Sequence, residues 1–126
     1  MPNAYAIAHL RTPQFNDDVL DYLERVQSTL DPFGGQFLVR GADVEVREGA
    51  WPGTIVVIQF PDAAAAGGWY ESPAYQAILP LRTNNIDGDA IVVTGVDAGY
   101  SAANTAAMVR AALVSRLAGG AARGPR

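Results

Sequence analysis

The 126-residue sequence contains no cysteine and no lysine, and its one histidine is His9. Without cysteine there can be no disulfide, thiolate nucleophile or cysteine-based metal centre. A metal site would have to rest on carboxylates, and none of them cluster with the spacing of a metal motif. The sequence also has no phosphate-binding loop, dinucleotide fingerprint or Ser-His-Asp order. We therefore expect no metal and no cofactor.

Long hydrophobic runs are also missing, since none approaches the length of a transmembrane helix. The first residues lack the basic segment and the long apolar stretch of a signal peptide. We therefore expect a cytoplasmic protein without a membrane partner. The composition, 49% hydrophobic and 17% charged, is typical of one globular domain with its own core.

Charge is unevenly distributed along the chain. The segment through Asp97 has five arginines and all 13 acidic residues, a balance of −8, whereas the rest carries four arginines and no acid. Nucleic-acid binding needs a basic patch, so we expect no nucleic-acid partner for the acidic segment. The basic end could contact nucleic acid or an acidic protein, but its four spaced charges favour a solvated helix face, so we expect no nucleic-acid partner for the chain.

Residue periodicity predicts two successive β-α-β units. The predicted strands are Ala4–Arg11, Thr54–Phe60, Ala90–Val96 and one edge strand in two pieces, Gln36–Arg40 and Asp43–Glu48, with a bulge or tight bend between them at Gly41-Ala42. The predicted helices are Asp17–Leu30, a two-part segment that starts at Asp62 and restarts at Ser72-Pro73, and Ser101–Leu117. The predicted apolar side of the first helix comprises Val19, Leu20, Leu23, Val26, Gln27 and Leu30.

This order predicts an α+β fold of the ferredoxin-like βαββαβ type, a four-stranded antiparallel sheet with both helices on one face. We expect the domain over residues 1–97, a C-terminal helical extension over 98–118 and a disordered tail over 119–126.

Two of the predicted strands, Thr54–Phe60 and Ala90–Val96, are apolar on both faces. Leaving such side chains in water would forgo roughly 1.5–3 kcal/mol each. A second copy packed sheet on sheet would cover them and form a dimeric α+β barrel, so we expect a homodimer. Alternatively, the final helix could fold back over that face.

Several motifs together resemble the family known as domain of unknown function 1330, over roughly Ala4 to Val96. They are Gly34-Gly35, Arg40-Gly41, Glu48-Gly49-Ala50-Trp51, Phe60-Pro61, Trp69-Tyr70-Glu71-Ser72-Pro73-Ala74-Tyr75 and Leu81-Arg82. The resemblance implies the dimeric α+β barrel superfamily and no settled activity. The chain departs from the family pattern at Gln59, where glutamate is usual, and in the helix that follows Val96.

His9 is the candidate catalytic residue, because histidine titrates near neutral pH. If it faces away from the helices, it points into the barrel beside Gln59 or Arg40. There it could act as a general base or bind a ligand, and Gln59 would be a further ligand contact. Alternatively, His9 is a structural residue with its hydrogen bonds satisfied.

The candidate ligand-binding residues are Arg40, Gln59, Trp69, Tyr70, Ser72, Tyr75 and Arg82. Arginines bind carboxylates with paired hydrogen bonds, although Arg40 and Arg82 could instead form ion pairs with Glu48, Glu71 or Asp89. The aromatic residues surround a predicted helix N-terminus at Ser72, a combination that suits a small planar acid. They could equally pack the helix on the sheet.

Two functions remain open from the sequence. The first is a small-molecule-binding protein, including a cofactor-independent enzyme that acts on a small aromatic or carboxylated metabolite. The second is a non-catalytic accessory or structural protein that binds a partner through its basic C-terminal helix. Fold analogy alone does not decide whether the protein is an enzyme.

Overall fold

The computed structural model describes residues 2–12 and 14–123 and divides the chain into two units, Met1–Val96 and Asp97–Arg126. The first unit contains β1 (Ala4–Leu10), α1 (Asp17–Leu30), the short helix η1 (Asp31–Phe33), β2 (Gln36–Arg40), β3 (Thr54–Phe60), α2 (Ala63–Glu71), α3 (Pro73–Thr83) and β4 (Gly88–Thr94). The second contains α4 (Ala102–Arg123).

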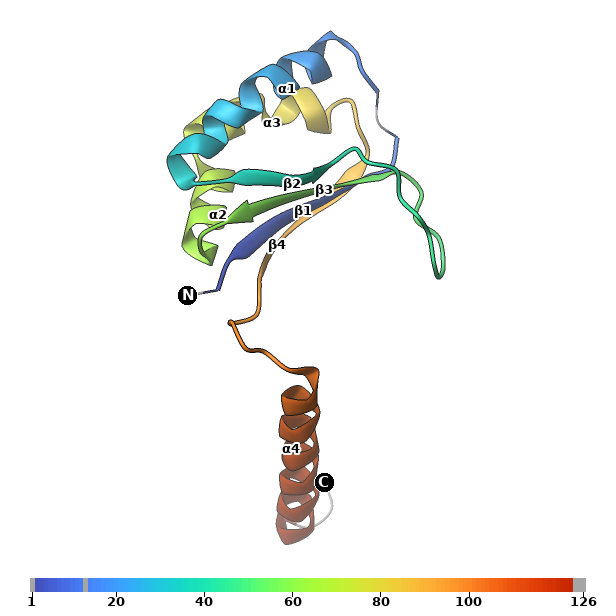
Figure 1. Ribbon diagram of the computed structural model, residues 1–126, viewed down its shortest axis with the longest axis vertical. Coiled ribbons are helices and arrows are strands. Elements are labelled where there is room, and N and C mark those ends of the chain that lie inside the picture. The colour runs from blue at the N-terminus through green and yellow to red at the C-terminus, as the bar shows by residue number, and fades with distance from the viewer. Residues whose placement is uncertain (1, 13, 124–126) are drawn as a thin grey trace. The chain divides into compact units, whose positions relative to one another are not determined.

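The four strands form one antiparallel sheet in the order β2-β3-β1-β4. Helices cover one face of this sheet: α2 lies against β1, β3 and β4, and α1 lies along α3 (Figure 1). This is the ferredoxin-like arrangement that the order of predicted elements indicates, and the structure confirms it.

Alternation along the strands separates two faces of the sheet. The helix-covered face contributes Ala4, Ile58 and Phe60 to the core, where they pack with buried helical side chains such as Leu30 and Tyr75. The opposite face, which we call the open face, consists of Tyr5, Ile7 and His9 from β1, Ile55, Val57 and Gln59 from β3, and Asp89, Ile91 and Val93 from β4. None of the open-face side chains is fully buried within the chain.

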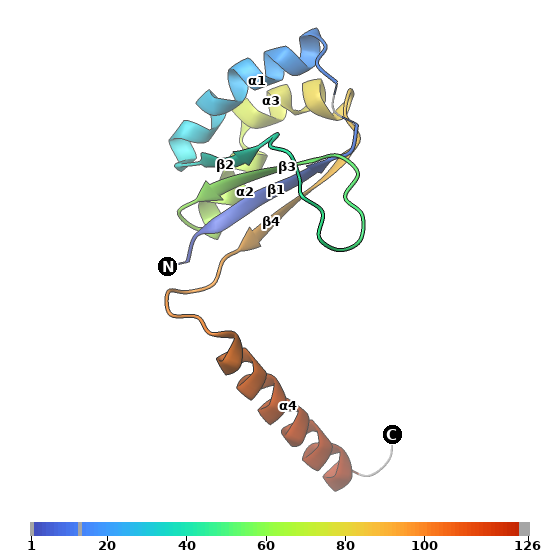
Figure 2. The same cartoon turned by 45° about the vertical axis from the view of Figure 1, so that its right-hand side comes forward.

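The predicted strand over Asp43–Glu48 is wrong, because residues 41–53 form a long exposed loop between β2 and β3 (Figure 2). β3 begins at Thr54, so it has no residues left to pair with 43–48 once Arg40 lies opposite Val56. The alternating charges that resembled an edge strand form a local ion pair, Arg47 with Glu45 at 2.8 Å.

Two element boundaries also differ from the prediction. β4 spans Gly88–Thr94, two residues earlier than predicted, because its ends pair with Leu10 and Ala4 at the two ends of β1. The α4 helix continues to Arg123, so residues 119–123 are helical where a disordered tail was predicted. The remainder of that predicted tail, 124–126, lies outside the described residues.

The buried side of α1 is rotated from the predicted apolar stripe. The buried residues are Val19, Tyr22, Val26, Thr29 and Leu30, whereas Leu20 is 44% exposed and Gln27 is exposed. Tyrosine and threonine thus replace a leucine and a glutamine of the predicted stripe, because both find hydrogen-bond partners inside the domain.

On α4, the apolar side chains of Met108, Leu113 and Leu117 are more than half exposed. Among the described residues, no helix is both long and apolar enough to cross a membrane.

Candidate functional site

A cavity of about 460 Å³ lies between the helices and the helix-covered face of the sheet. Most of its surface is apolar, with walls that include Val19, Leu23, Val56, Ile58 and Ile86. This volume falls in the range of small-molecule sites, which combine apolar walls with a few polar groups. The domain therefore has room for a small organic molecule on the helix side of the sheet.

The polar part of the cavity is built by Tyr22, Tyr75 and Arg82, which we call the Tyr22–Tyr75–Arg82 cluster. The hydroxyl oxygens of the two tyrosines lie 2.8 Å apart and share a buried hydrogen bond. Arg82 Nη2 donates to the Tyr75 hydroxyl at 3.5 Å, and the guanidinium carbon lies 5.8 Å from the centre of the Tyr22 ring.

Local sequence brings this cluster together. Tyr22 follows Val19 by three residues and precedes Val26 by four, so all three share the buried side of α1. On α3, Tyr75 and Arg82 are seven residues apart, which puts them on one face. Because α1 lies along α3, the two faces meet over the sheet.

The electrostatics of the cluster are unusual because Arg82 is only 9% exposed yet forms no ion pair with an acidic residue in the part of the chain that the structure describes. The ion pairs among the described residues join Arg11 to Asp89, Arg25 to Asp21 and Arg47 to Glu45. Buried arginines are normally paired. Burial also raises the pKa of Tyr22 far above its usual range, so this phenol stays protonated and neutral.

The predicted role of Ser72 as the helix cap agrees with the structure. Its hydroxyl accepts from the backbone N–H of Tyr75 at 3.2 Å and donates to the carbonyl of Trp69 at 2.7 Å. Ser72 is not among the residues that line the cavity. Its contribution is to fix the start of α3 and with it the position of Tyr75.

Trp69 and Tyr70 line the cavity from the end of α2. Trp69 is 3% exposed, its ring centre lies 4.1 Å from that of Tyr75, and its indole N–H donates to Thr29 Oγ1 at 3.0 Å. Trp69 is therefore mainly a core residue with one edge on the cavity. Arg40 also lines the cavity, as an exposed residue at the end of β2.

His9 and Gln59 lie on the open face and are not among the cavity-lining residues. The antiparallel register places His9 opposite Ile55 and Asp89, whereas Gln59 is opposite Tyr5. The expectation that His9 lies beside Gln59 or Arg40 is therefore wrong. Gln59 is four residues along β3 from Ile55, the partner of His9, and Arg40 is on the helix side opposite Val56.

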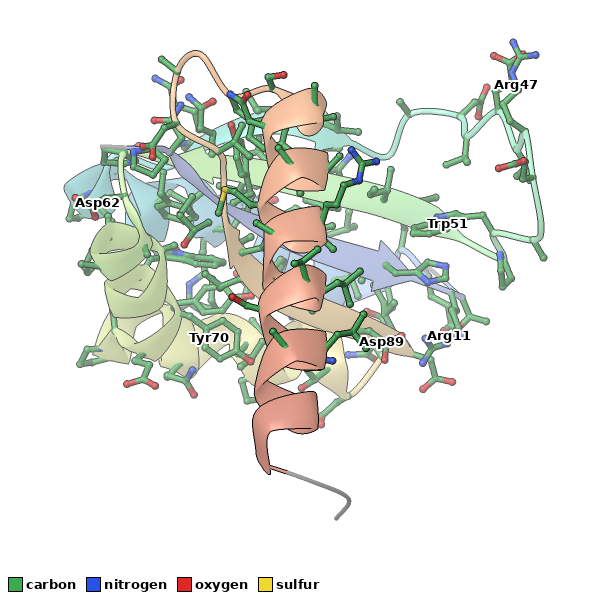
Figure 3. The ribbon with its side chains drawn as sticks, turned by 90° about the horizontal axis from the view of Figure 1, so that it is seen from below. Arg11, Arg47, Trp51, Asp62, Tyr70 and Asp89 are labelled. Atoms are coloured by element: carbon green, nitrogen blue, oxygen red, sulfur yellow. The ribbon has the colours of Figure 1, made fainter. Side chains whose placement is uncertain are left out.

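His9 instead contacts the long loop over residues 41–53. Its Nε2 donates to the carbonyl of Pro52 at 2.7 Å, and its ring stacks on Trp51 with 4.3 Å between ring centres. Figure 3 shows Trp51 near this end of the sheet, where Arg11 forms an ion pair with Asp89. Asp89 is thus paired with Arg11, not with either of the arginines proposed for it from the sequence.

Tyr22 belongs to the polar part of the cavity but was not among the candidate site residues from the sequence. One signal was available, because Tyr22 lies at helical spacing between Val19 and Val26 and so had to fall on the buried side of the helix. A buried tyrosine hydroxyl needs a hydrogen-bond partner, which would have pointed to a polar group on the facing element.

The antiparallel sheet in this order, with helices on one face and a cavity between the layers, defines a ferredoxin-like α+β protein. The chain belongs to the family described as Domain of unknown function (DUF1330), whose model matches residues 3–96. The family resemblance seen in the sequence is thereby confirmed. A search of curated proteins found no match.

Solved structures support the fold alone, because all are distant in sequence. The methylated RPA0582 protein of Rhodopseudomonas palustris is 15% identical, with a TM-score of 0.58 over 79% of this chain and 84% of that one. A dimeric ferredoxin-like protein of unknown function from Jannaschia sp. CCS1 is 13% identical, with a TM-score of 0.51 over 72% of this chain and 97% of that one. A hypothetical Arabidopsis thaliana protein is 12% identical, with a TM-score of 0.50 over 79% and 92%.

Proposed function

We propose that the domain binds a small aromatic or carboxylated molecule in the cavity between helices and sheet. The observation that carries the proposal is a mostly apolar cavity of about 460 Å³ with the nearly buried Arg82 in its wall, an arginine that has no acidic partner among the described residues. A ligand in this space would bury apolar surface and meet a small set of fixed polar groups, as in most small-molecule sites.

The arrangement favours binding over the acid–base chemistry that His9 would have supplied. In the described part of the chain, the cavity lining contains neither a carboxylate nor an imidazole. General-base catalysis requires such a group within hydrogen-bond reach of the substrate. His9 is on the other face of the sheet and already donates to Pro52, so we infer that it has a structural role.

We expect a cavity-filling substitution to weaken binding strongly. Ala8→Phe places a ring among the lining residues, so the affinity for an apolar fluorescent dye should fall about tenfold or more. Ala64→Phe is the matched control, since Ala64 is exposed on α2 and outside the lining. Dye titration measures the affinity, and native mass spectrometry of freshly purified wild type shows whether a small molecule is retained. Equal dye affinity in the two variants, with circular dichroism showing both folded, would contradict the proposal.

The open face supports a second part of the proposal, a homodimer in which two sheets pack together. Ile91 is 56% exposed and Val93 is 42% exposed on β4, and Ile55 and Val57 are partly exposed on β3, across β1 from them. Burying such side chains against a second copy would contribute roughly 1.5–3 kcal/mol each. The Jannaschia protein of the same fold is described as dimeric.

We expect Val93→Asp to convert the dimer into a monomer of 13.3 kDa by light scattering, because it buries a carboxylate in the proposed interface. Val109→Asp is the matched control, the same change at a valine that is 53% exposed on α4. A dimer that survives Val93→Asp but dissociates with Val109→Asp would show that α4, and not the sheet, joins the subunits.

A further inference from the structure

Arg82 has more hydrogen-bonding capacity than the domain uses. A guanidinium carries five N–H donors, and the hydrogen bond recorded for the Arg82 side chain is one long contact of 3.5 Å to Tyr75. Arg82 is only 9% exposed, and no carboxylate forms an ion pair with it among the described residues. An anion in the cavity would provide the missing counter-charge.

The tyrosines add a neutral donor next to this charge. Each phenol has one O–H donor, and one of the two protons is used in the hydrogen bond between Tyr22 and Tyr75. The second O–H is free to donate to a ligand. Tyr22 stays neutral because burial raises its pKa, so it does not compete with an incoming anion by carrying a charge of its own. Arg82 and one hydroxyl can therefore contact two oxygens of the same ligand.

The anion that fits this site carries a single charge. A phosphate has close to two negative charges and is usually held by several cations or by a helix N-terminus. The cluster contains one buried cation, Arg82. The rest of the adjoining wall is aromatic or aliphatic and includes Val19, Tyr75 and Ile86. A carboxylate matches the guanidinium in charge and in its planar, two-oxygen geometry.

The apolar part of the cavity limits the size and the polarity of the rest of the ligand. One water molecule occupies about 30 Å³ of liquid, so a cavity of about 460 Å³ has room for roughly ten to fifteen non-hydrogen atoms. Val56, Ile58 and Leu23 face this space, and they have no polar side-chain atoms to bind further oxygens. The other cation in the described lining, Arg40, is exposed at the end of β2, so a second carboxylate beside Leu23 and Ile58 would remain unpaired.

We propose that the Tyr22–Tyr75–Arg82 cluster is a carboxylate-recognition site, and that the ligand is a monocarboxylic acid with an apolar aliphatic or aromatic body of that size. The carboxylate contacts Arg82 and one tyrosine hydroxyl, and the body fills the apolar part of the cavity. This inference rests on the proposed function, since it specifies which of the small molecules admitted by the cavity are bound.

The test compares 3-phenylpropionate with 3-phenylpropanamide, a neutral molecule of nearly the same shape, by isothermal titration calorimetry on the full chain. Because a buried hydrogen bond between two charged groups is stronger than one to a neutral group, we expect the acid to bind at least about tenfold more tightly than the amide. Arg82→Met should remove this preference by weakening acid binding while leaving amide binding unchanged. Arg25→Met is the matched control, since Arg25 is an exposed arginine on α1, and it should keep the wild-type preference.

Wild type alone separates the possible failures, so the test does not depend on the folding of Arg82→Met. If acid and amide bind with equal affinity, the carboxylate site is wrong while the ligand-binding cavity stands. If neither probe binds and the fluorescent dye also fails to bind, the proposed function is wrong as well. If Arg82→Met keeps the full preference for the acid, another cation holds the carboxylate and this assignment is overturned.

Discussion

Replacing Trp69 with alanine is expected to lower the free energy of unfolding by about 3–5 kcal/mol, the usual cost of truncating a buried aromatic side chain. Trp69 is 3% exposed, and its ring packs between Phe60, at 5.4 Å between ring centres, and Tyr75, at 4.1 Å. The substitution also removes the donor to Thr29 Oγ1. Urea denaturation followed by circular dichroism measures the loss.

Two further variants separate packing from hydrogen bonding at this position. Thr29→Val keeps the shape of the side chain but leaves the indole N–H without its acceptor, at an expected cost of about 1–3 kcal/mol. Trp69→Phe retains much of the packing, so its loss should fall below that of alanine. If Trp69→Ala changed stability by less than about 1 kcal/mol and abolished ligand binding, Trp69 would be a ligand contact and not a core residue.

The second large effect is expected from Gly53→Ala, with a loss of about 2–6 kcal/mol from backbone strain and steric overlap combined. Gly53 has a φ of +118°, in the region that favours glycine. A Cβ at this position would overlap the carbonyl oxygen of Leu10 and lie 2.7 Å from the Cα of Arg11. Backbone atoms at the end of β1 cannot move aside as a flexible side chain would.

Gly49→Ala is the control, because Gly49 also has a positive φ, +71°, but a Cβ there would meet no atom within 4 Å. It should cost only the conformational penalty of about 1–2 kcal/mol. Equal losses in the two variants would mean that steric contact with β1 contributes nothing. Thermal and urea denaturation of both variants measure the two losses.

The fold was largely predictable because its signals are local. The alternation in β1 and the apolar run of β3 identify strands, and Ser72-Pro73 marks the start of α3. The false strand over 43–48 shows the limit of such signals. Alternation indicates that a segment can be a strand, but whether a partner has residues left to pair with it depends on the register of the whole sheet.

The candidate site was predicted less completely, because burial and facing elements are long-range properties. Arg40, Trp69, Tyr70, Tyr75 and Arg82 do line the cavity. The sequence could not show that Arg82 lacks an acidic partner, since this depends on how α1 lies along α3. Nor could it show that the cavity is on the helix side of the sheet, and His9 was therefore assigned to a site that lies elsewhere.

One consequence follows from the alternation of side chains along β3. Val56 and Ile58 face the cavity, whereas their immediate neighbours Ile55 and Val57 belong to the open face. The proposed ligand cavity and the proposed subunit interface thus take alternate residues of the same strand. We expect substitutions at Val56 and Ile58 to change ligand binding without altering assembly, and substitutions at Ile55 and Val57 to do the reverse. An insertion or deletion of a single residue in β3 would exchange the two sets and damage both properties at once.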